Sequence, residues 1–189
     1  MAKSKYDKWV YRKPAVILQD GAEAIVDKLD IKGPDTGSIT WYSRTFDKNA
    51  QSIIELTIIS GDIFVGRGTE WPPKKLVAES ADGDPAVGRG VDWPPHKHTY
   101  DEMFLFQGLD HKDPLDLGAE IEFWLGEGKD LEKIEFKTST NVYMPAGLAH
   151  FPMKVKNLKR PFMIITFMPK ATERTLIPAS LEGRPVRKT

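Results

Sequence analysis

Three of the four histidines in this chain lie in two short segments whose residue types suit a metal ion. His96 and His98 are followed by Glu102, and the even spacing places all three side chains on one face of an extended strand. His150 follows some fifty residues later in the segment Pro-Ala-Gly-Leu-Ala-His. Imidazole and carboxylate together suit iron, manganese, nickel, zinc or copper. The pattern therefore predicts a mixed nitrogen and oxygen site that His150 completes from a neighbouring strand.

The composition limits which donors and which partners are available. The chain has 189 residues and no cysteine, so disulfides, thiolate zinc sites, iron–sulfur clusters and cysteine nucleophiles are excluded. Lys plus Arg and Asp plus Glu are equal at 27 each, which favours neither a nucleic acid nor an anionic membrane as partner. No apolar run has the length of a signal peptide or a membrane span, so we expect a cytoplasmic protein.

The elements that must position these ligands are predicted to be strands. A hydrophobic content of 40% indicates one globular core, and no amphipathic helix of convincing length is present. Short runs rich in β-branched and aromatic residues alternate with Gly, Pro, Asp and Lys, which is typical of an all-β sandwich or barrel. The expected strands are residues 39–46, 53–59, 103–106, 119–125, 133–136, 141–144 and 162–167. We expect an N-terminal arm over residues 1–38, a barrel over 39–175 and a C-terminal tail over 176–189.

One internal repeat is visible. The segment 66–75 reads Gly-Arg-Gly-Thr-Glu-Trp-Pro-Pro-Lys-Lys, and 88–97 reads Gly-Arg-Gly-Val-Asp-Trp-Pro-Pro-His-Lys. A local duplication of one turn and strand entry is the favoured interpretation. The alternative is that Arg67 and Arg89 form a related pair beside the site.

Two spacings in residues 85–170 resemble the conserved motifs of the cupin superfamily. In that family a glycine precedes a His-x-His pair, a glutamate and a second glycine, and a Pro-x-Gly-x-x-His turn supplies the last ligand. The matching residues here are Gly90, His96, His98, Glu102 and Gly108, then Pro145, Gly147 and His150. The chain departs from the family at Ser139 and Lys154, where glycine and asparagine are usual, and neither position is a ligand.

The resemblance implies a fold, a cofactor and a class of function. The fold is a jelly-roll-like double-stranded β-helix barrel holding one divalent transition metal (Fe, Mn, Ni or Zn) on His96, His98, Glu102 and His150. Such a ligand set leaves positions on the metal for a small oxygen-rich molecule, which favours an oxygenase, isomerase or decarboxylase over a closed structural site. The alternative is a non-catalytic small-molecule-binding cupin. The resemblance also implies a homodimer.

Four further side chains are candidates for the pocket. Phe104 and Phe106 share the face of Glu102 and are expected to form an apolar wall. Tyr143 precedes the second motif by two residues and could reach a substrate as a catalytic group. Glu122 alternates with apolar residues, which favours a solvent-facing position, and the alternative is a catalytic acid or base inside the barrel. His111 is expected to be a solvated loop residue.

Overall fold

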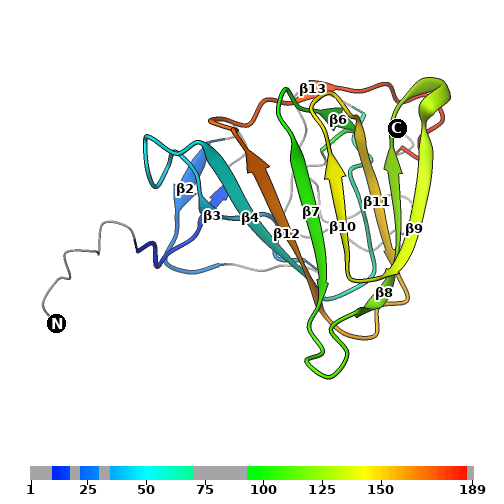
Figure 1. Ribbon diagram of the computed structural model, residues 1–189, viewed down its shortest axis with the longest axis horizontal. Coiled ribbons are helices and arrows are strands. Elements are labelled where there is room, and N and C mark those ends of the chain that lie inside the picture. The colour runs from blue at the N-terminus through cyan, green and yellow to red at the C-terminus, as the bar shows by residue number, and fades with distance from the viewer. Residues whose placement is uncertain (1–9, 18–21, 30–34, 70–92, 187–189) are drawn as a thin grey trace, which may run out of the picture.

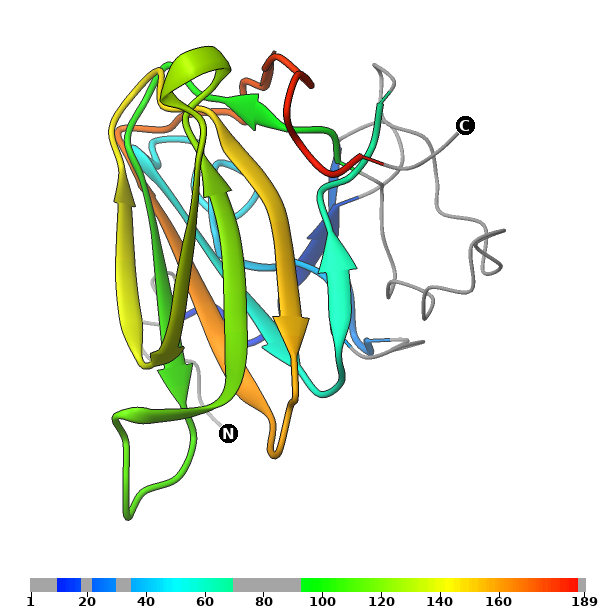
Figure 2. The ribbon, with the colours of Figure 1, turned by 90° about the vertical axis from the view of Figure 1, so that its right-hand side faces the viewer.

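The computed structural model describes residues 10–17, 22–29, 35–69 and 93–186, and these form two antiparallel β-sheets (Figure 1). The seven-stranded sheet has the order β10 (Thr140–Met144), β7 (Glu102–Gly108), β12 (Phe162–Pro169), β4 (Ser52–Ile59), β3 (Ile39–Tyr42), β1 (Ala15–Ile17) and β2 (Glu23–Ile25). The six-stranded sheet has the order β13 (Ile177–Pro178), β6 (His96–Lys97), β11 (His150–Lys156), β8 (Asp116–Leu125) and β9 (Glu132–Thr138), with β5 (Ile63–Val65) paired to β11. Figure 2 shows β5 alongside β11. The predicted all-β fold is confirmed.

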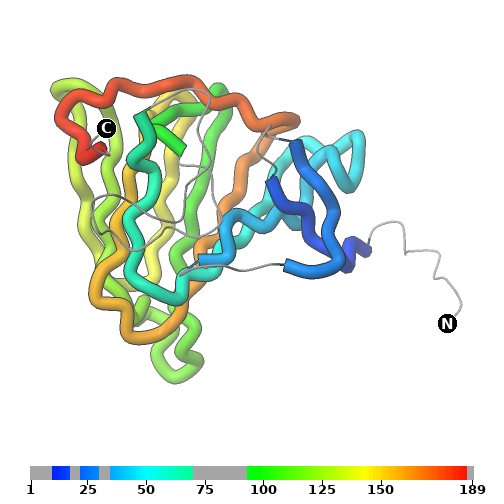
Figure 3. Tube along the Cα trace, turned by 180° about the vertical axis from the view of Figure 1, so that it is seen from behind, coloured from blue at the N-terminus to red at the C-terminus, as the bar shows by residue number. Residues whose placement is uncertain are grey.

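Both ends of the described chain contribute strands to the sheets. In the predicted arm, β1 pairs with β2 and with β3, so the seven-stranded sheet continues beyond β3. Figure 3 shows these strands at the end of the molecule away from β8 and β9. In the predicted tail, β13 pairs with β6, which carries His96. Segments outside the motif region therefore complete both sheets.

The core lies between the sheets and is built largely from strands in which buried residues alternate with less buried ones, as in β7 and β12. Along β8, Leu117, Ala119, Ile121 and Phe123 are buried, while the residues between the last three are only partly covered. Buried side chains from both sheets meet in one cluster that includes Phe104, Phe106, Phe123 and Phe162. Full burial stabilises the fold by about 1.5–3 kcal/mol for each such side chain.

The strand β11 and the short strands β5 and β13 were not predicted. β11 contains Pro152, Lys154 and Lys156, and proline and lysine are depleted in strands. β11 nevertheless forms a full strand because its neighbours β8 and β5 supply the register. Among the described residues no helix has the length and apolar character needed to span a membrane.

Ser139 stands between β9 and β10, where the cupin motif usually has glycine. Its hydroxyl donates to the carbonyl oxygen of Pro114 (2.7 Å) and accepts from the amide of Gly108 (2.9 Å). A side chain at this position therefore links two other segments, which accounts for the departure from the motif.

Two glycines in the turn after β8 give a matched test of backbone packing. Gly126 (φ 79°) and Gly128 (φ 58°) are both in the left-handed region, but only at Gly126 would a Cβ meet backbone, 2.1 Å from the carbonyl oxygen of Asp130. We expect Gly128→Ala to cost about 1–2 kcal/mol through its dihedral alone. Gly126→Ala should cost about 2–5 kcal/mol because the clash adds to that. Urea unfolding of both variants measures the difference, and equal losses would contradict this account.

Candidate metal centre

The segment that carries the first ligands crosses from one sheet to the other. One straight strand from His96 to Phe106 was predicted, and this is wrong: β6 ends at Lys97 in the six-stranded sheet and β7 begins at Glu102 in the seven-stranded sheet. Residues 99 and 100 form the bend between them. The alternation itself holds within β7, where Glu102, Phe104 and Phe106 are buried. The bend therefore brings ligands from both sheets to the space between them.

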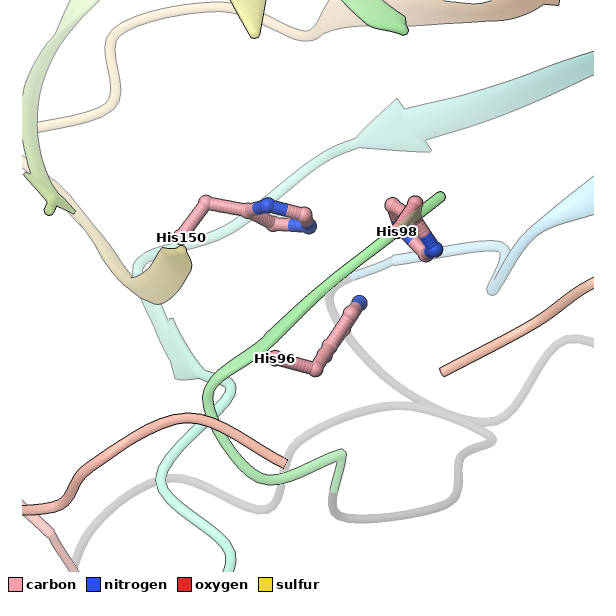
Figure 4. A group of neighbouring side chains, drawn as sticks. All are labelled: His96, His98 and His150. Carbon is pink, nitrogen blue, oxygen red and sulfur yellow. The ribbon is translucent and has the colours of Figure 1, made fainter. Parts of the chain in front are cut away.

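Three histidines meet in that space. One ring nitrogen of each of His96, His98 and His150 lies within 4.8 Å of the other two, and all three side chains are buried. His96 and His150 are direct register partners on β6 and β11, with ring centroids 4.5 Å apart. Figure 4 shows the three rings gathered around a common space. The structure thus brings together the three imidazoles that the two motifs predicted.

Backbone carbonyls fix the tautomer of each ring. The Nδ1 of His96 lies 2.8 Å from the carbonyl oxygen of Pro94, and the Nδ1 of His150 lies 3.3 Å from that of Leu148. The Nδ1 of His98 lies 2.6 Å from the carbonyl oxygen of Thr175. A carbonyl only accepts, so each Nδ1 carries the hydrogen and each Nε2 keeps its lone pair when the ring is neutral. This arrangement is typical of histidines that bind a metal through Nε2.

Glu102 adjoins the histidines. Its Oε2 lies 3.2 Å from the Nε2 of His98 and 3.2 Å from the Nε2 of His150. Both distances lie within hydrogen-bonding range, yet among the described residues neither Glu102 Oε2 nor His150 Nε2 has a hydrogen-bond partner. Buried polar atoms without partners cost about 1–3 kcal/mol each. A cation satisfies such atoms, so the residues fit a divalent transition metal, which when bound supplies Lewis-acid or redox chemistry.

The ionisation of these groups depends on burial. Burial lowers the pKa of His96 to about 3 and holds the pKa of His150 well below its ordinary value, so both rings are neutral at pH 7 as metal binding requires. Burial also acts to lower the pKa of His98, but the adjacent carboxylate of Glu102 outweighs it and the pKa is raised. Burial raises the pKa of Glu102. Burial therefore disfavours the protonated forms of His96 and His150 and the ionised form of Glu102. A bound cation would stabilise the neutral rings as ligands and the ionised carboxylate.

The turn that delivers His150 is fastened to the first motif. The amide of Gly147 donates to the carbonyl oxygen of His98 (2.9 Å). Asp101 accepts from the amide of Ala146 (3.0 Å) and from the hydroxyl of Tyr143 (2.8 Å). Tyr143 is 52% exposed and does not line the cavity described below. The structure gives the predicted catalytic tyrosine a contact that holds the turn.

Glu122 lies on the outer side of β8. Its side chain is ion-paired with Lys156 and lies 3.7 Å from Lys133, while the adjacent residue Phe123 is fully buried. The favoured solvent-facing position of Glu122 agrees with this placement on the outer side of β8. His111 is exposed in a turn, away from the cluster.

A cavity of about 180 Å³ opens beside the cluster. His96, His98 and Glu102 line it, as does Phe104, so a molecule in the cavity would lie against three of the predicted ligands. Phe106 does not line it and instead packs edge-on against Phe136, with ring centroids 4.9 Å apart. Of the two residues predicted to form the apolar wall, only Phe104 lines the cavity.

Three further cavity residues were missed from the sequence. Phe151 follows His150 in a left-handed conformation (φ 72°), and its ring centroid lies 5.5 Å from that of His96. Glu55 and Arg174 are joined by hydrogen bonds across 119 positions of sequence. The sequence gives one sign that Glu55 faces inward: on β4, Glu55 and Thr57 fall on the same face as the buried Ile53 and Ile59.

Most of the internal repeat lies outside the described residues, including Arg89, so neither the favoured local duplication nor the alternative pairing of Arg67 with Arg89 is tested. Gly66 (φ 76°) packs against the site, since a Cβ there would lie 2.6 Å from a ring carbon of Phe151. The guanidinium carbon of Arg67 lies 4.3 Å from the ring centroid of Phe64.

No protein-family model matches the sequence. No curated protein matches it either. Among solved structures, the fold is similar to an oxalate oxidase (9% identity, TM-score 0.44, covering 86% of this chain and 65% of that one). It is also similar to a cupin-like protein from Thermotoga maritima (6% identity, TM-score 0.41, covering 81% and 82%) and to a polyketide cyclase from Streptomyces resistomycificus (12% identity, TM-score 0.40, covering 85% and 87%).

The chain spans just under two thirds of the length of the oxalate oxidase. The resemblance to the cupin superfamily that the two motifs carry fits the two-sheet fold and the buried histidine cluster.

Removal of one imidazole tests the centre directly. We expect His150→Ala to weaken metal binding by more than about 100-fold, because loss of a ligand exceeds the 10–100-fold effect of losing a supporting group. Metal titration of metal-free protein, followed by calorimetry and by the rise in Tm, measures this. His111→Ala removes an exposed histidine and serves as the control. Equal metal binding by both variants would contradict the assignment.

Proposed function

We propose that this protein is a metal-dependent cupin enzyme that holds one divalent transition metal on His96, His98, Glu102 and His150. The observation that supports it best is the convergence of three buried imidazoles, each with its Nδ1 on a backbone carbonyl, beside a cavity. Glu102 joins them as the fourth ligand on the strength of its two 3.2 Å contacts.

The position of the cavity favours catalysis over a structural role. Structural metal sites are closed by their protein ligands, whereas catalytic sites leave access for a substrate. Here three of the four proposed ligands also line the cavity. Phe104, Ile164 and Met153 supply apolar walls, which would exclude water around a small organic molecule. The substrate is therefore proposed to be a small oxygen-rich molecule that reaches the metal.

The reaction is proposed to be of the oxygenase, isomerase or decarboxylase type. The second candidate is a non-catalytic cupin in which the same metal orients a bound molecule. The cavity geometry supports both, because binding at the metal is common to them.

Turnover separates the two candidates. Protein loaded separately with Fe²⁺, Mn²⁺, Ni²⁺ or Zn²⁺ is incubated with β-diketones, catechols, keto-sugars and oxalate-like acids, and oxygen uptake and product masses are followed. We expect turnover with at least one metal, and none from the His96→Ala/His98→Ala double variant because it lacks two ligands. Binding of a test molecule without turnover under every condition would favour the second candidate. Failure to bind any metal would contradict both.

We also propose that the chain forms a homodimer through the outer face of the seven-stranded sheet. Register pairs place Tyr143, Met103, Phe167 and Ile54 in one row, and Leu105, Ile165 and Leu56 in the next. None of these is a fully buried core residue, and Tyr143, Leu105 and Ile54 are at least 36% exposed. An uncharged apolar face is complementary to a second copy of itself.

A charge in the middle of this face tests the dimer. We expect Leu105→Glu to shift sedimentation from dimer to monomer, because an unpaired charge buried in an interface costs about 3–5 kcal/mol. Leu115→Glu makes the same change in an exposed loop and should remain dimeric. A monomeric parent protein at micromolar concentration would contradict the proposal.

A further inference from the structure

A second group of charged residues lines the cavity of the proposed metal centre. Glu55 projects inward from β4, and Arg174 follows β12 in the chain. Their side chains are only 7% and 15% exposed. The Nε of Arg174 donates to Glu55 Oε1 at 2.8 Å, and its Nη2 donates to the same oxygen. The guanidinium therefore holds Glu55 in one orientation.

Arg174 is also bound to a second carboxylate. Its Nη1 donates to Glu23 Oε1 and its Nη2 donates to the hydroxyl of Thr40 at 2.9 Å. Ser43 donates to the other oxygen of Glu23. Both oxygens of Glu23 thus have partners, and Glu23 does not line the cavity.

Glu55 differs from Glu23 in how its oxygens are used. Every hydrogen bond to Glu55 from the described residues ends on Oε1. Its Oε2 receives none from that part of the chain, and the residue lines the cavity. One oxygen is therefore anchored, and the other is available to a bound molecule.

The charged lining of the cavity is anionic before a metal binds. Within the described residues it comprises Glu102, Glu55 and Asp35, with Arg174 as the fixed cation. Arg174 is already shared between Glu55 and Glu23. Such a lining favours a ligand that donates hydrogens and opposes one that brings further carboxylates.

We propose that Glu55 is the specificity-determining residue of this cavity: its Oε2 accepts a hydrogen bond from a hydroxyl of an uncharged phenol, enol or diol, with Arg174 as its positioning residue. This inference rests on the proposed metal function and narrows its substrate class to hydroxylated neutral molecules over carboxylic acids. The selection arises because the same carboxylate attracts a hydroxyl hydrogen and repels an anionic oxygen.

The test compares Glu55→Gln with Glu23→Gln, which removes an equally buried carboxylate from the same guanidinium but not from the cavity. Each protein is loaded with Co²⁺ without oxygen, its metal content is confirmed, and catechol and oxalate are titrated by calorimetry. In the parent protein we expect catechol to bind more tightly than oxalate. Glu55→Gln should weaken catechol by about 10–100-fold, as for loss of a charge-assisted hydrogen bond, and should tighten oxalate. Glu23→Gln should change the ratio of the two affinities by less than about threefold.

Opposite changes for the two probes are the signature of specificity, because a general loss of structure would weaken both. Glu55→Asp provides a second variant, which keeps the charge opposite Arg174 but withdraws the carboxylate by one methylene. Catechol should bind this variant more weakly than the parent protein, while the affinity for oxalate should stay low. The inference is overturned if parent protein prefers oxalate, or if catechol binds equally to parent, Glu55→Gln and Glu55→Asp. The His150→Ala experiment tests the metal centre, whereas the Glu55 variants test which ligand the metal-loaded protein prefers. Failure of one proposal is therefore distinguishable from failure of the other.

Discussion

Three imidazole rings are buried together in the space between the two sheets, and this burial governs the chemistry of the site. The Nε2 of His150 and the Oε2 of Glu102 are buried, and the described chain gives them no hydrogen-bond partner. A fold that merely needed stability would fill this space with apolar side chains, since unsatisfied buried polar atoms oppose folding. The cluster is instead held in a form that a cation completes. Each ring is anchored at Nδ1 by a backbone carbonyl. Those of Pro94 and Leu148 lie two residues before His96 and His150, whereas that of Thr175 lies 77 residues after His98.

The carbonyl that orients His98 makes C-terminal residues part of the site. Thr175 supplies the carbonyl that orients His98, and Arg174 beside it holds Glu55. Further along, the buried Arg184 donates to the carbonyl oxygens of Phe151 and Gly126, next to His150 and at the end of β8. The segment after β12 therefore closes over the ligands from two sides, and the boundary between barrel and tail drawn from the sequence at residue 175 falls within the site.

The sequence was most informative where the physical cause is local. Alternation within β7 and β8 predicted which residues face the core, and the spacing of His96, His98 and His150 predicted their convergence. The bend between β6 and β7 was missed because even spacing is the same on a straight strand and on two strands that meet at an angle. The positions of Glu122 and Tyr143 needed the sheet itself, because their roles depend on Lys156 and Asp101 as partners. Glu55 and Arg174 are 119 residues apart, and no spacing rule connects them.

The buried group of Glu23, Glu55 and Arg174 is hard to explain by stability alone. Buried ion pairs seldom stabilise a fold more than well-packed apolar residues do, because desolvation offsets the attraction. Here two carboxylates share one guanidinium, which leaves one negative charge uncompensated within the group. A divalent cation on the histidines of the same cavity would offset this charge together with that of Glu102. The two charged groups of the cavity are thus electrostatically interdependent, since the carboxylates that line it increase its affinity for a cation and the cation lowers the cost of burying them.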